Sequence, residues 1–352
     1  MEYKNILIIK MSSVGDILHA LPFAAALRER YPEAKISWLV HPQFAGFIPE
    51  APWIDEVLYF DKEAFKRMSW TEKLAYAQKL RQELRSKNFD LVIDLQGLFK
   101  SGVMAYLTGC PTKIGYCEMR EGSGLVSKAI GGEHSQDHVI ERYLDVARYL
   151  GAKVQGVDFP MPNLKQESAE IQVKLTAIAG KNYVVLVPGA RWETKQWPTE
   201  YYARLAQLFV QDGYGVVLAG GKADQVLGAK IKLALPKHIT LSVVDLIGKT
   251  TLRELAALIK DAIFYVSADT GPLHMASAYK KPLLAMYGPT KPERTGPYGN
   301  PHATIITAEM PCAGCLKKHC TNWRCMHSIT PEQVYSVFQN KMKGAEGNGI
   351  EQ

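Results

Sequence analysis

The feature that most constrains this chain is an alternation of short apolar runs with longer helical patterns along almost its whole length. The apolar runs are nearly continuous in Val, Ile and Leu. Such runs are typical of parallel strands that helices cover on both faces. The pattern therefore predicts an α/β fold built from doubly wound sheets. In the first half we expect strands at residues 5–10, 35–40, 56–60 and 90–95, and helices at 16–32, 71–87 and 137–151.

A single interruption divides the alternation into two halves. The stretch VDFPMPNLKQES, residues 157–168, contains Pro160 and Pro162, which suit an extended linker. A chain of 352 residues is long enough for two cores, so we expect two domains of similar size. The strands expected in the second half occupy residues 183–190, 214–221, 239–246, 263–271 and 282–289, and the helices 198–213, 223–235, 250–262 and 330–343.

Local sequence also predicts where several of these helices begin. A Ser or Thr followed three residues later by Glu or Gln has the spacing of a capping box, in which each residue satisfies a backbone amide of the first turn. This spacing occurs as Ser69 with Glu72, Thr251 with Glu254 and Thr330 with Gln333.

Composition restricts the class of partner. The net charge of +7 is modest and dispersed, so it allows an acidic ligand or an anionic membrane surface but does not indicate nucleic acid. The N-terminus lacks the pattern of a signal peptide, and the apolar stretch at residues 17–27 is too short to cross a bilayer. We therefore expect a cytoplasmic protein whose six cysteines are reduced or metal-bound.

Ligands of doubly wound folds lie at the carboxyl ends of the strands, so the residues after each strand carry the functional argument. The stretch SADTGPLH places Asp269, Thr270 and Gly271 at the start of a helix. Backbone amides and a hydroxyl in that position can hold a diphosphate, helped by the helix dipole. The same residues are ordinary cap and turn residues, so this pattern alone leaves both interpretations open.

A second loop supplies a cation. The stretch PGARWETKQWP follows an expected strand and contains Gly189, Arg191, Thr194 and Lys195. The lysine would lie near the phosphate loop if the two strands are neighbours in the sheet. The alternative is a solvated loop with surface charges. The two tryptophans of the stretch argue against that alternative, because indole side chains are usually buried.

The first turn between strand and helix has a different character. Its sequence, MSSVGD, lacks the G-x-G-x-x-G fingerprint, which disfavours a dinucleotide-dependent dehydrogenase. It carries Asp16 directly after Gly15. A carboxylate there would repel a phosphate group, so we expect this turn to serve a different substrate.

The order of the motifs resembles that of a known family. SSVGDILHALP, DLQG, PGA with a later KxWP, AGG, SADTGPLHMASA and YGPT follow one another as in the heptosyltransferases of glycosyltransferase family 9. The resemblance implies the GT-B architecture, an α/β fold in which two Rossmann-like doubly wound domains face a central cleft. It implies an acceptor-binding domain at residues 1–160, a nucleotide-sugar-binding domain at 169–329, and a helix at 330–345 that crosses back to the first domain.

The resemblance also implies an activity, the transfer of a heptose from ADP-heptose to the inner core of lipopolysaccharide with inversion at the anomeric carbon. Lys195 would act in catalysis by neutralising phosphate charge as the leaving group departs. Thr250 matches the position beside the adenine, and Asp224 is a candidate for the ribose. His274 would lie near the diphosphate or be a buried helix histidine. The implied donor-binding set is Gly189, Thr194, Lys195, Thr250, Asp269, Thr270, Gly271 and His274.

On the acceptor side, the resemblance identifies Asp16 as the general base, which takes the proton of the attacking hydroxyl. The alternative is that Asp16 only caps its helix, where the dipole stabilises the carboxylate and weakens it as a base. Lys100 and Arg120 are interpreted as contacts to an acidic acceptor or as surface cations. The implied acceptor-binding set is Ser12, Ser13, Gly15, Gln96, Lys100 and Arg120.

A cysteine-rich stretch near the C-terminus, CAGCLKKHCTNWRCMH, permits a further expectation. Its spacing could hold a structural zinc ion or an iron–sulfur cluster. The alternative is a surface loop with free thiols. We expect no cofactor to be required for catalysis. The candidate ligands are Cys312, Cys315, Cys320 and Cys325.

The expected partners follow from this interpretation: ADP-heptose or a related nucleotide sugar, the lipid A core as acceptor, and the inner-membrane surface. Two alternatives keep the fold and change the reaction, namely a sugar-nucleotide epimerase and a phosphorylase. A third is a metal-binding or nucleic-acid-binding module built around the cysteines. The dispersed charge argues against the nucleic-acid module, and the SSVGD and ADTGPLH pair argues against the first two.

Overall fold

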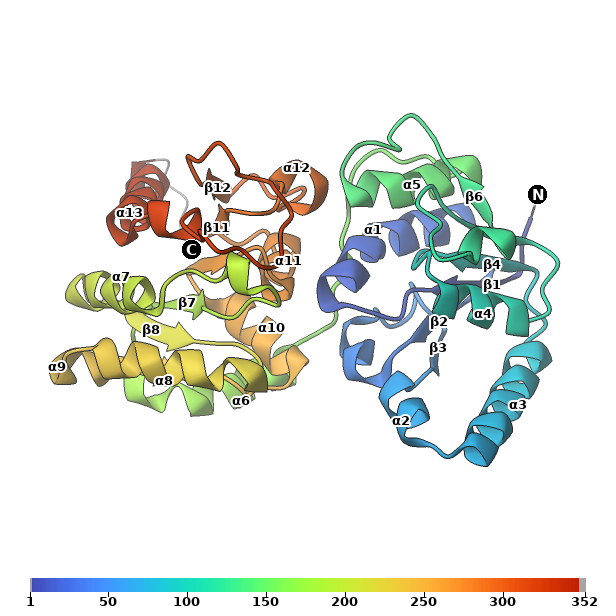
Figure 1. Ribbon diagram of the computed structural model, residues 1–352, viewed down its shortest axis with the longest axis horizontal. Helices are drawn as coiled ribbons and strands as arrows, with labels where there is room; N and C mark the ends of the chain where they lie inside the picture. The colour runs from blue at the N-terminus through green and yellow to red at the C-terminus, as the bar shows by residue number, and fades with distance from the viewer. Residues whose placement is uncertain (1, 348–352) are drawn as a thin grey trace. The chain divides into compact units, whose positions relative to one another are not determined.

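The computed structural model describes residues 2–347 and divides into two compact units, with the boundary between Pro162 and Asn163 (Figure 1). Each unit contains one six-stranded sheet, and the strand pairs recorded in both sheets are parallel. The strand orders are β3-β2-β1-β4-β5-β6 and β12-β11-β10-β7-β8-β9. Each unit therefore has the strand order 3-2-1-4-5-6 of a Rossmann fold. The expectation of two Rossmann-like doubly wound domains is confirmed.

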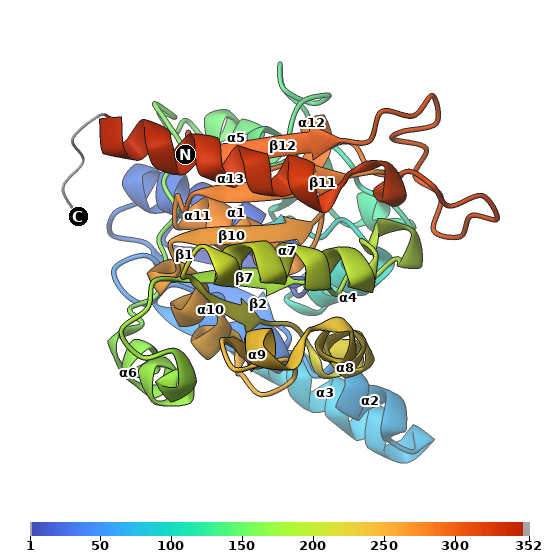
Figure 2. The same cartoon turned by 90° about the vertical axis from the view of Figure 1, so that its left-hand side faces the viewer.

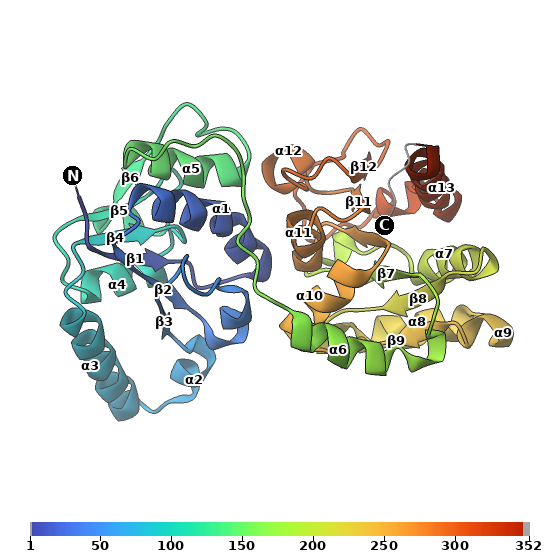
Figure 3. The same cartoon turned by 180° about the vertical axis from the view of Figure 1, so that it is seen from behind.

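In the first unit, α1 and α5 pack together on one face of the sheet, and α3 and α4 cover the other (Figure 3). The inner strands are buried because both faces of the sheet are covered. The strands are β1 (Asn5–Ile9), β2 (Lys35–Val40), β3 (Glu56–Tyr59), β4 (Leu91–Asp94), β5 (Lys113–Tyr116) and β6 (Lys128–Ile130). The α-helices are α1 (Val14–Arg30), α2 (Lys62–Arg67), α3 (Trp70–Ser86), α4 (Phe99–Leu107) and α5 (Val139–Tyr149), and the 3-10 helices are η1 (Pro42–Phe47) and η2 (Ser123–Leu125).

The second unit repeats the same plan. Its strands are β7 (Tyr183–Val187), β8 (Gly215–Leu218), β9 (Val243–Asp245), β10 (Phe264–Ala268), β11 (Leu283–Tyr287) and β12 (Ala303–Thr307). Its α-helices are α6 (Lys165–Lys174), α7 (Thr199–Gln211), α8 (Gln225–Ala234), α9 (Lys237–Thr240), α10 (Leu252–Asp261), α11 (Gly271–Ala278), α12 (Pro292–Thr295) and α13 (Pro331–Gly347). Its 3-10 helices are η3 (Thr176–Ile178), η4 (Glu193–Lys195), η5 (Lys222–Asp224) and η6 (Met326–Ser328).

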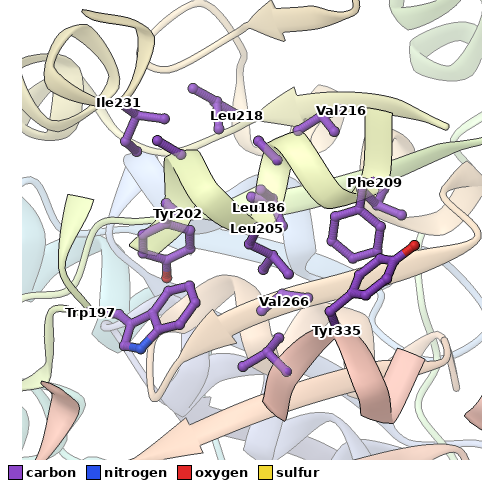
Figure 4. Packing of buried hydrophobic residues seen from close by; sticks show 14 of the residues in the cluster. Leu186, Trp197, Tyr202, Leu205, Phe209, Val216, Leu218, Ile231, Val266 and Tyr335 are labelled. Carbon is purple, nitrogen blue, oxygen red and sulfur yellow. The ribbon is translucent and has the colours of Figure 1, made fainter. Parts of the chain in front are cut away.

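The core of the second unit joins α7 and α13 to one face of the sheet. Tyr202, Leu205 and Phe209 project from α7 into this core (Figure 4). The ring of Phe209 meets that of Phe338 edge to face, with the centroids 4.9 Å apart. Trp197 is buried beside Tyr202 and donates its indole N–H to the carbonyl of Ile329 over 2.8 Å. The KxWP motif thus attaches the start of α7 to the segment that leads into α13.

The packing of α13 is described within its own unit. The helix lies against α7 and β11 (Figure 2), and Val334 and Phe338 are part of that unit's core. That residues 330–345 cross back to the first domain stays a prediction. The expected capping box at its start is present, because Gln333 and Thr330 exchange hydrogen bonds.

Several elements were not predicted. Edge strands β6 and β12 bury few residues, so neither produces a continuous apolar run. Residues 165–168, expected to be an extended linker, form the first turn of α6. Residues 239–242, expected to begin a strand, complete α9 and a turn before β9.

No helix within residues 2–347 has the length and apolar character needed to cross a bilayer.

Candidate active site

The first βα turn holds Asp16 in a defined position. Ser13 is the cap of α1, and Asp16 is the third residue of that helix. One carboxylate oxygen, Oδ2, accepts hydrogen bonds from the backbone N–H and from the hydroxyl of Ser13, both over 2.8 Å. The carboxylate is half-buried, and Gly15 beside it is buried. Asp16 therefore caps α1 and still has a carboxylate at the carboxyl edge of the sheet. The interpretations of Asp16 as a helix cap and as a general base do not exclude one another.

The loop after β4 is joined directly to this turn. Gln96 Oε1 accepts hydrogen bonds from the backbone N–H groups of Met11 and Ser12, each over 3.1 Å. Lys100, in the first turn of α4, donates to the Ser12 hydroxyl over 3.2 Å. β1 and β4 are neighbours in the sheet, so their carboxyl ends bring these residues together. Lys100, Ser12 and Met11 also line a hollow of about 170 Å³.

Arg120 belongs to the next loop along the same edge. Its backbone N–H donates to the carbonyl of Gly97 over 2.8 Å, which ties the loop after β5 to the loop after β4. Tyr116, at the end of β5, is buried, and burial raises its pKa to about 12, with Glu118 adding to the shift and Arg120 opposing it. The structure therefore brings every residue of the expected acceptor-binding set to the carboxyl edge of one sheet.

Sequence reasoning missed a buried lysine at this edge. Lys10 directly follows β1 and is 2% exposed. Its ammonium donates to the carbonyl of Leu95 over 2.7 Å and to the hydroxyl of Tyr143 over 2.6 Å. Burial lowers the pKa of Lys10, while the nearby carboxylates of Asp16 and Asp94 oppose that change. The available signal in the sequence was a lysine at the end of an otherwise apolar strand. Buried lysines are rare, so a lysine in that position indicates a specific role.

In the second unit, Lys195 and Asp269 form an ion pair. β7 and β10 are neighbours, so the loops that follow them meet. Lys195 Nζ lies 2.6 Å from Asp269 Oδ2 and 4.5 Å from the ring centre of Trp192. His274 is buried in α11, with Nε2 4.0 Å from the other carboxylate oxygen of Asp269. A cation, its carboxylate partner and an imidazole are thus collected at the end of β10.

The N-terminus of α11 is directed to the same place. Thr270 is the cap residue in extended conformation, and Gly271 and Pro272 are the first helical residues. The first amides of a helix lack partners within it and carry the positive end of its dipole. Lys195 therefore lies beside a helix terminus whose amides and charge suit an anion.

The ends of β8 and β9 continue this edge. Asp224 lies so close to Gly189 that a Cβ at position 189 would be 2.1 Å from its carboxyl carbon, which explains the glycine. The Asp224 carboxylate accepts from the N–H of Gly221 over 2.9 Å. Gly248 donates to the carbonyl of Gly220 over 2.9 Å and so holds the loop that carries Thr250. The expected donor residues therefore lie in the loops and first helical turns that follow β7, β9 and β10.

Comparison with known proteins decides the family. The sequence profile described as glycosyltransferase family 9 (heptosyltransferase) matches residues 77–325. Lipopolysaccharide heptosyltransferase 1 of Pseudomonas aeruginosa is 30% identical over 323 residues, which are 90% of this chain and 87% of that protein. The chain belongs to glycosyltransferase family 9. It is therefore a glycosyltransferase.

Solved structures agree with the family. The structure of E. coli ADP-heptose lps heptosyltransferase II matches with a TM-score of 0.80 at 25% identity, covering 98% of this chain and all of that one. E. coli heptosyltransferase WaaC with ADP matches with a TM-score of 0.75 at 26% identity, covering 96% and 99%. These matches extend over both Rossmann-like units, as the GT-B architecture requires.

One expected donor residue of this family 9 enzyme has another role. Thr194 is buried, and its hydroxyl donates to the carbonyl of Lys317 over 2.8 Å, while its own carbonyl accepts from the indole of Trp323 over 2.9 Å. Thr194 therefore anchors the cysteine-rich loop to the loop after β7. The hydroxyl of Thr194 thus has a structural partner, and its contact to the donor stays a prediction.

The cysteines of that loop do not form a metal centre. Cys312, Cys315 and Cys320 are exposed, and Cys325 is half-buried beside Gly288. Within residues 2–347, no three His, Cys, Asp or Glu side chains are arranged to hold a metal ion. The structure does not support the expected zinc or iron–sulfur site.

Proposed function

We propose that this family 9 glycosyltransferase moves a heptose from ADP-heptose to the inner core of lipopolysaccharide with inversion. The related proteins that carry heptosyltransferase names cover most of the chain, which supports the donor and the acceptor class. The observation that carries the mechanism is the half-buried carboxylate of Asp16, held by Ser13 at the edge where Ser12, Gln96 and Lys100 also lie.

The donor is assigned to the second unit. The diphosphate would bind the first amides of α11, and Lys195 would neutralise its charge. Asp269 positions Lys195 through their ion pair. The ribose and the base would extend along the ends of β8 and β9, where Asp224 and Thr250 lie. The order of the strand ends supports placing the diphosphate at β10 and the base towards β9. The cation Lys195 lies at the β10 end of this row, and small loops lie at the β9 end.

The proposed reaction is a single displacement. The acceptor hydroxyl oxygen forms a bond to the anomeric carbon while the bond from that carbon to the diphosphate oxygen breaks. Asp16 takes the hydroxyl proton, and ADP leaves with its added negative charge next to Lys195. Stabilising a charge that develops only in the transition state should increase the rate more than it strengthens donor binding.

Lys100 and Arg120 supply positive charge on the acceptor side. An acidic, phosphorylated acceptor is attracted to such a surface, although each exposed ion pair contributes little by itself. Because this acceptor is anchored in a lipid, we place the reaction at the cytoplasmic face of the inner membrane.

The test is a transfer assay with ADP-heptose and a lipopolysaccharide inner-core acceptor. Asp16→Asn keeps the shape of the side chain and an oxygen for the Ser13 amide, so α1 should remain capped. We expect kcat to fall by about 10²–10⁴-fold with little change in the Kd for ADP-heptose, which is the usual size of a lost general base.

Ser13→Ala is the matched control, because it removes one hydrogen bond to the carboxylate and leaves the base in place. It should lose much less activity than Asp16→Asn. Near-normal turnover by Asp16→Asn would show that Asp16 is a cap and that the base lies elsewhere.

A further inference from the structure

A helical hairpin of the first unit combines exposed apolar residues with an excess of positive charge. Residues 62–87, which form α2 and α3, contain eight Lys or Arg residues and three Glu residues. This segment therefore has a net charge of +5, against +7 for the whole chain. Of its acids, Glu63 pairs with Lys66, and Glu72 accepts a hydrogen bond from the backbone of Ser69. Positive charge is therefore more concentrated in this segment than the dispersed charge expected from the sequence as a whole.

One exposed stripe of α3, which borders the buried positions Leu80 and Leu84 and is called its outer face below, has a defined order. Trp70 is 75% exposed and Leu74 is 57% exposed, and Arg81 and Arg85 are also exposed. At about 100° per residue, these four positions lie within a stripe of about 60° around the helix. Trp70 is the first residue of α3, next to the loop that joins the two helices at the periphery of the unit (Figure 1). The stripe thus runs from an indole and a leucine to two guanidinium groups.

The inner face of the hairpin is anchored. Phe65 of α2 and Tyr76 of α3 have ring centroids 5.7 Å apart, and both pack on Phe60. Leu80 and Leu84 are buried in the core beneath α3. Because the inner contacts fix the helix, the exposed stripe is a stable surface and does not result from fraying. An isolated exposed leucine needs no explanation, but an ordered stripe that includes a Trp does.

The hairpin also begins at the candidate acceptor residues. Lys62 and Glu63, at the start of α2, line the same hollow of about 170 Å³ as Ser12 and Lys100. A molecule that enters this hollow would therefore extend from the acceptor-binding edge towards the hairpin.

We propose that the outer face of α3, with Trp70, Leu74, Arg81 and Arg85, docks this protein on an anionic lipid bilayer. Tryptophan favours the headgroup region, where its ring is buried and its N–H stays hydrated. Lys and Arg close to the surface are attracted to anionic headgroups, and an apolar anchor joined to a basic patch gives the two signals that stable but reversible binding requires. That this docking delivers the enzyme to a lipid-anchored acceptor rests on the proposed function.

The binding test needs neither donor nor acceptor. Purified full-length protein is sedimented with vesicles of phosphatidylglycerol and phosphatidylethanolamine, and with vesicles of phosphatidylcholine alone. We expect binding to the anionic vesicles that weakens with salt. Trp70→Ser combined with Leu74→Ser should reduce the partition coefficient by about tenfold or more. Arg81→Gln combined with Arg85→Gln should reduce it by about tenfold at low salt.

Val173→Ser is the control, because Val173 is 76% exposed on α6, a helix of the second unit that carries equal numbers of Lys and Glu residues. It should bind vesicles like the wild type. The proposal is overturned if the wild type ignores anionic vesicles, if it binds phosphatidylcholine equally well, or if Val173→Ser loses as much binding as the α3 variants. Capture of another protein through α3 without vesicle binding would also overturn it.

A transfer assay separates this proposal from the proposed function. The α3 variants should keep their kcat/KM with a delipidated core oligosaccharide and lose activity with an acceptor embedded in anionic vesicles. If the wild type binds vesicles through α3 but transfers no heptose, the docking surface stands and the proposed function is wrong. Equal activity of wild type and α3 variants on the embedded acceptor would contradict the delivery role.

Discussion

Lys195 illustrates how one residue acquires a role from its neighbours. Its ammonium is held between the carboxylate of Asp269 and the face of Trp192. The ion pair fixes the direction of the side chain, and the adjacent helix terminus adds partial positive charge. In the proposed site, a diphosphate would meet a cation that is already in place, so little reorganisation would be needed when negative charge develops.

Lys195→Met should therefore reduce kcat by about 10²–10³-fold, the usual effect of losing one group that stabilises transition-state charge. The Kd for ADP-heptose should change much less. Lys195→Arg should retain more activity than Lys195→Met because it keeps the charge. Steady-state kinetics with titration of the donor measures both effects.

Lys318→Met is the matched control for Lys195. Lys318 Nζ lies 5.5 Å from the centre of the same indole ring and is not part of the proposed site. If both variants lose activity equally, Lys195 acts only through the general charge of the loop.

Lys10 provides a prediction about pH. Burial lowers its pKa below the ordinary value of 10.5, so the unfolded chain binds the proton more tightly than the folded chain. Folding stability should therefore rise with pH in the window between the lowered pKa and 10.5. We expect the free energy of unfolding of the wild type to increase relative to that of Lys10→Met as the pH is raised through this window.

Chemical denaturation of both proteins at several pH values measures that difference. Groups other than Lys10 titrate in both proteins, so the comparison isolates the lysine. A difference that stays constant with pH would contradict the lowered pKa. Lys10→Met should also lower transfer activity, because Leu95 and Tyr143 lose the donor that joins them at the acceptor edge.

At the scale of elements, the KxWP motif connects α7 to the segment before α13. Trp197 is 2% exposed, and its indole N–H is bonded to Ile329. Trp197→Ala should lower the free energy of unfolding by about 3–5 kcal/mol, because it removes a large buried ring and leaves a cavity. Trp70→Ala, on an exposed ring, should change it by less than about 0.5 kcal/mol. Urea denaturation monitored by circular dichroism compares the two, and equal losses would contradict the assigned burial.

The elements that sequence predicted well are those in which a local signal and burial agree. The capping boxes at Ser69 and Thr251 are formed, because the pairing of cap and third residue depends only on nearby backbone. The strands next to the centre of each sheet were recognised because both of their faces are apolar. The edge strands β6 and β12 were missed because exposed edges do not need an apolar run. The inner strand β5 was also missed, because Lys113 and Gly115 interrupt its apolar residues.

At the scale of the whole molecule, the two units use one plan with different loops. Both sheets have the same strand order, and in both the functional candidates follow the carboxyl ends of the strands. The first βα turn carries a carboxylate, and the corresponding edge of the second unit carries a cation and a helix terminus. The proposed division of a base and an anion site between two similar domains would therefore be a property of loop sequence and not of the fold.

The sequence by itself determined the fold class, the principal strands and helices, and most of the residues that gather at the strand ends. It could do so because periodicity, capping and turn chemistry are local properties of the chain. Only the tertiary structure showed that Asp269 holds Lys195, that Thr194 anchors a loop, and that Lys10 is buried beneath the acceptor edge. Those roles depend on residues that are distant in sequence and meet only when parallel strands align. The first turn, MSSVGD, shows the contribution of sequence and that of tertiary structure. Its sequence places the Asp16 carboxylate beside the cap of α1, and the neighbouring strand β4 brings Gln96 and Lys100 to this turn.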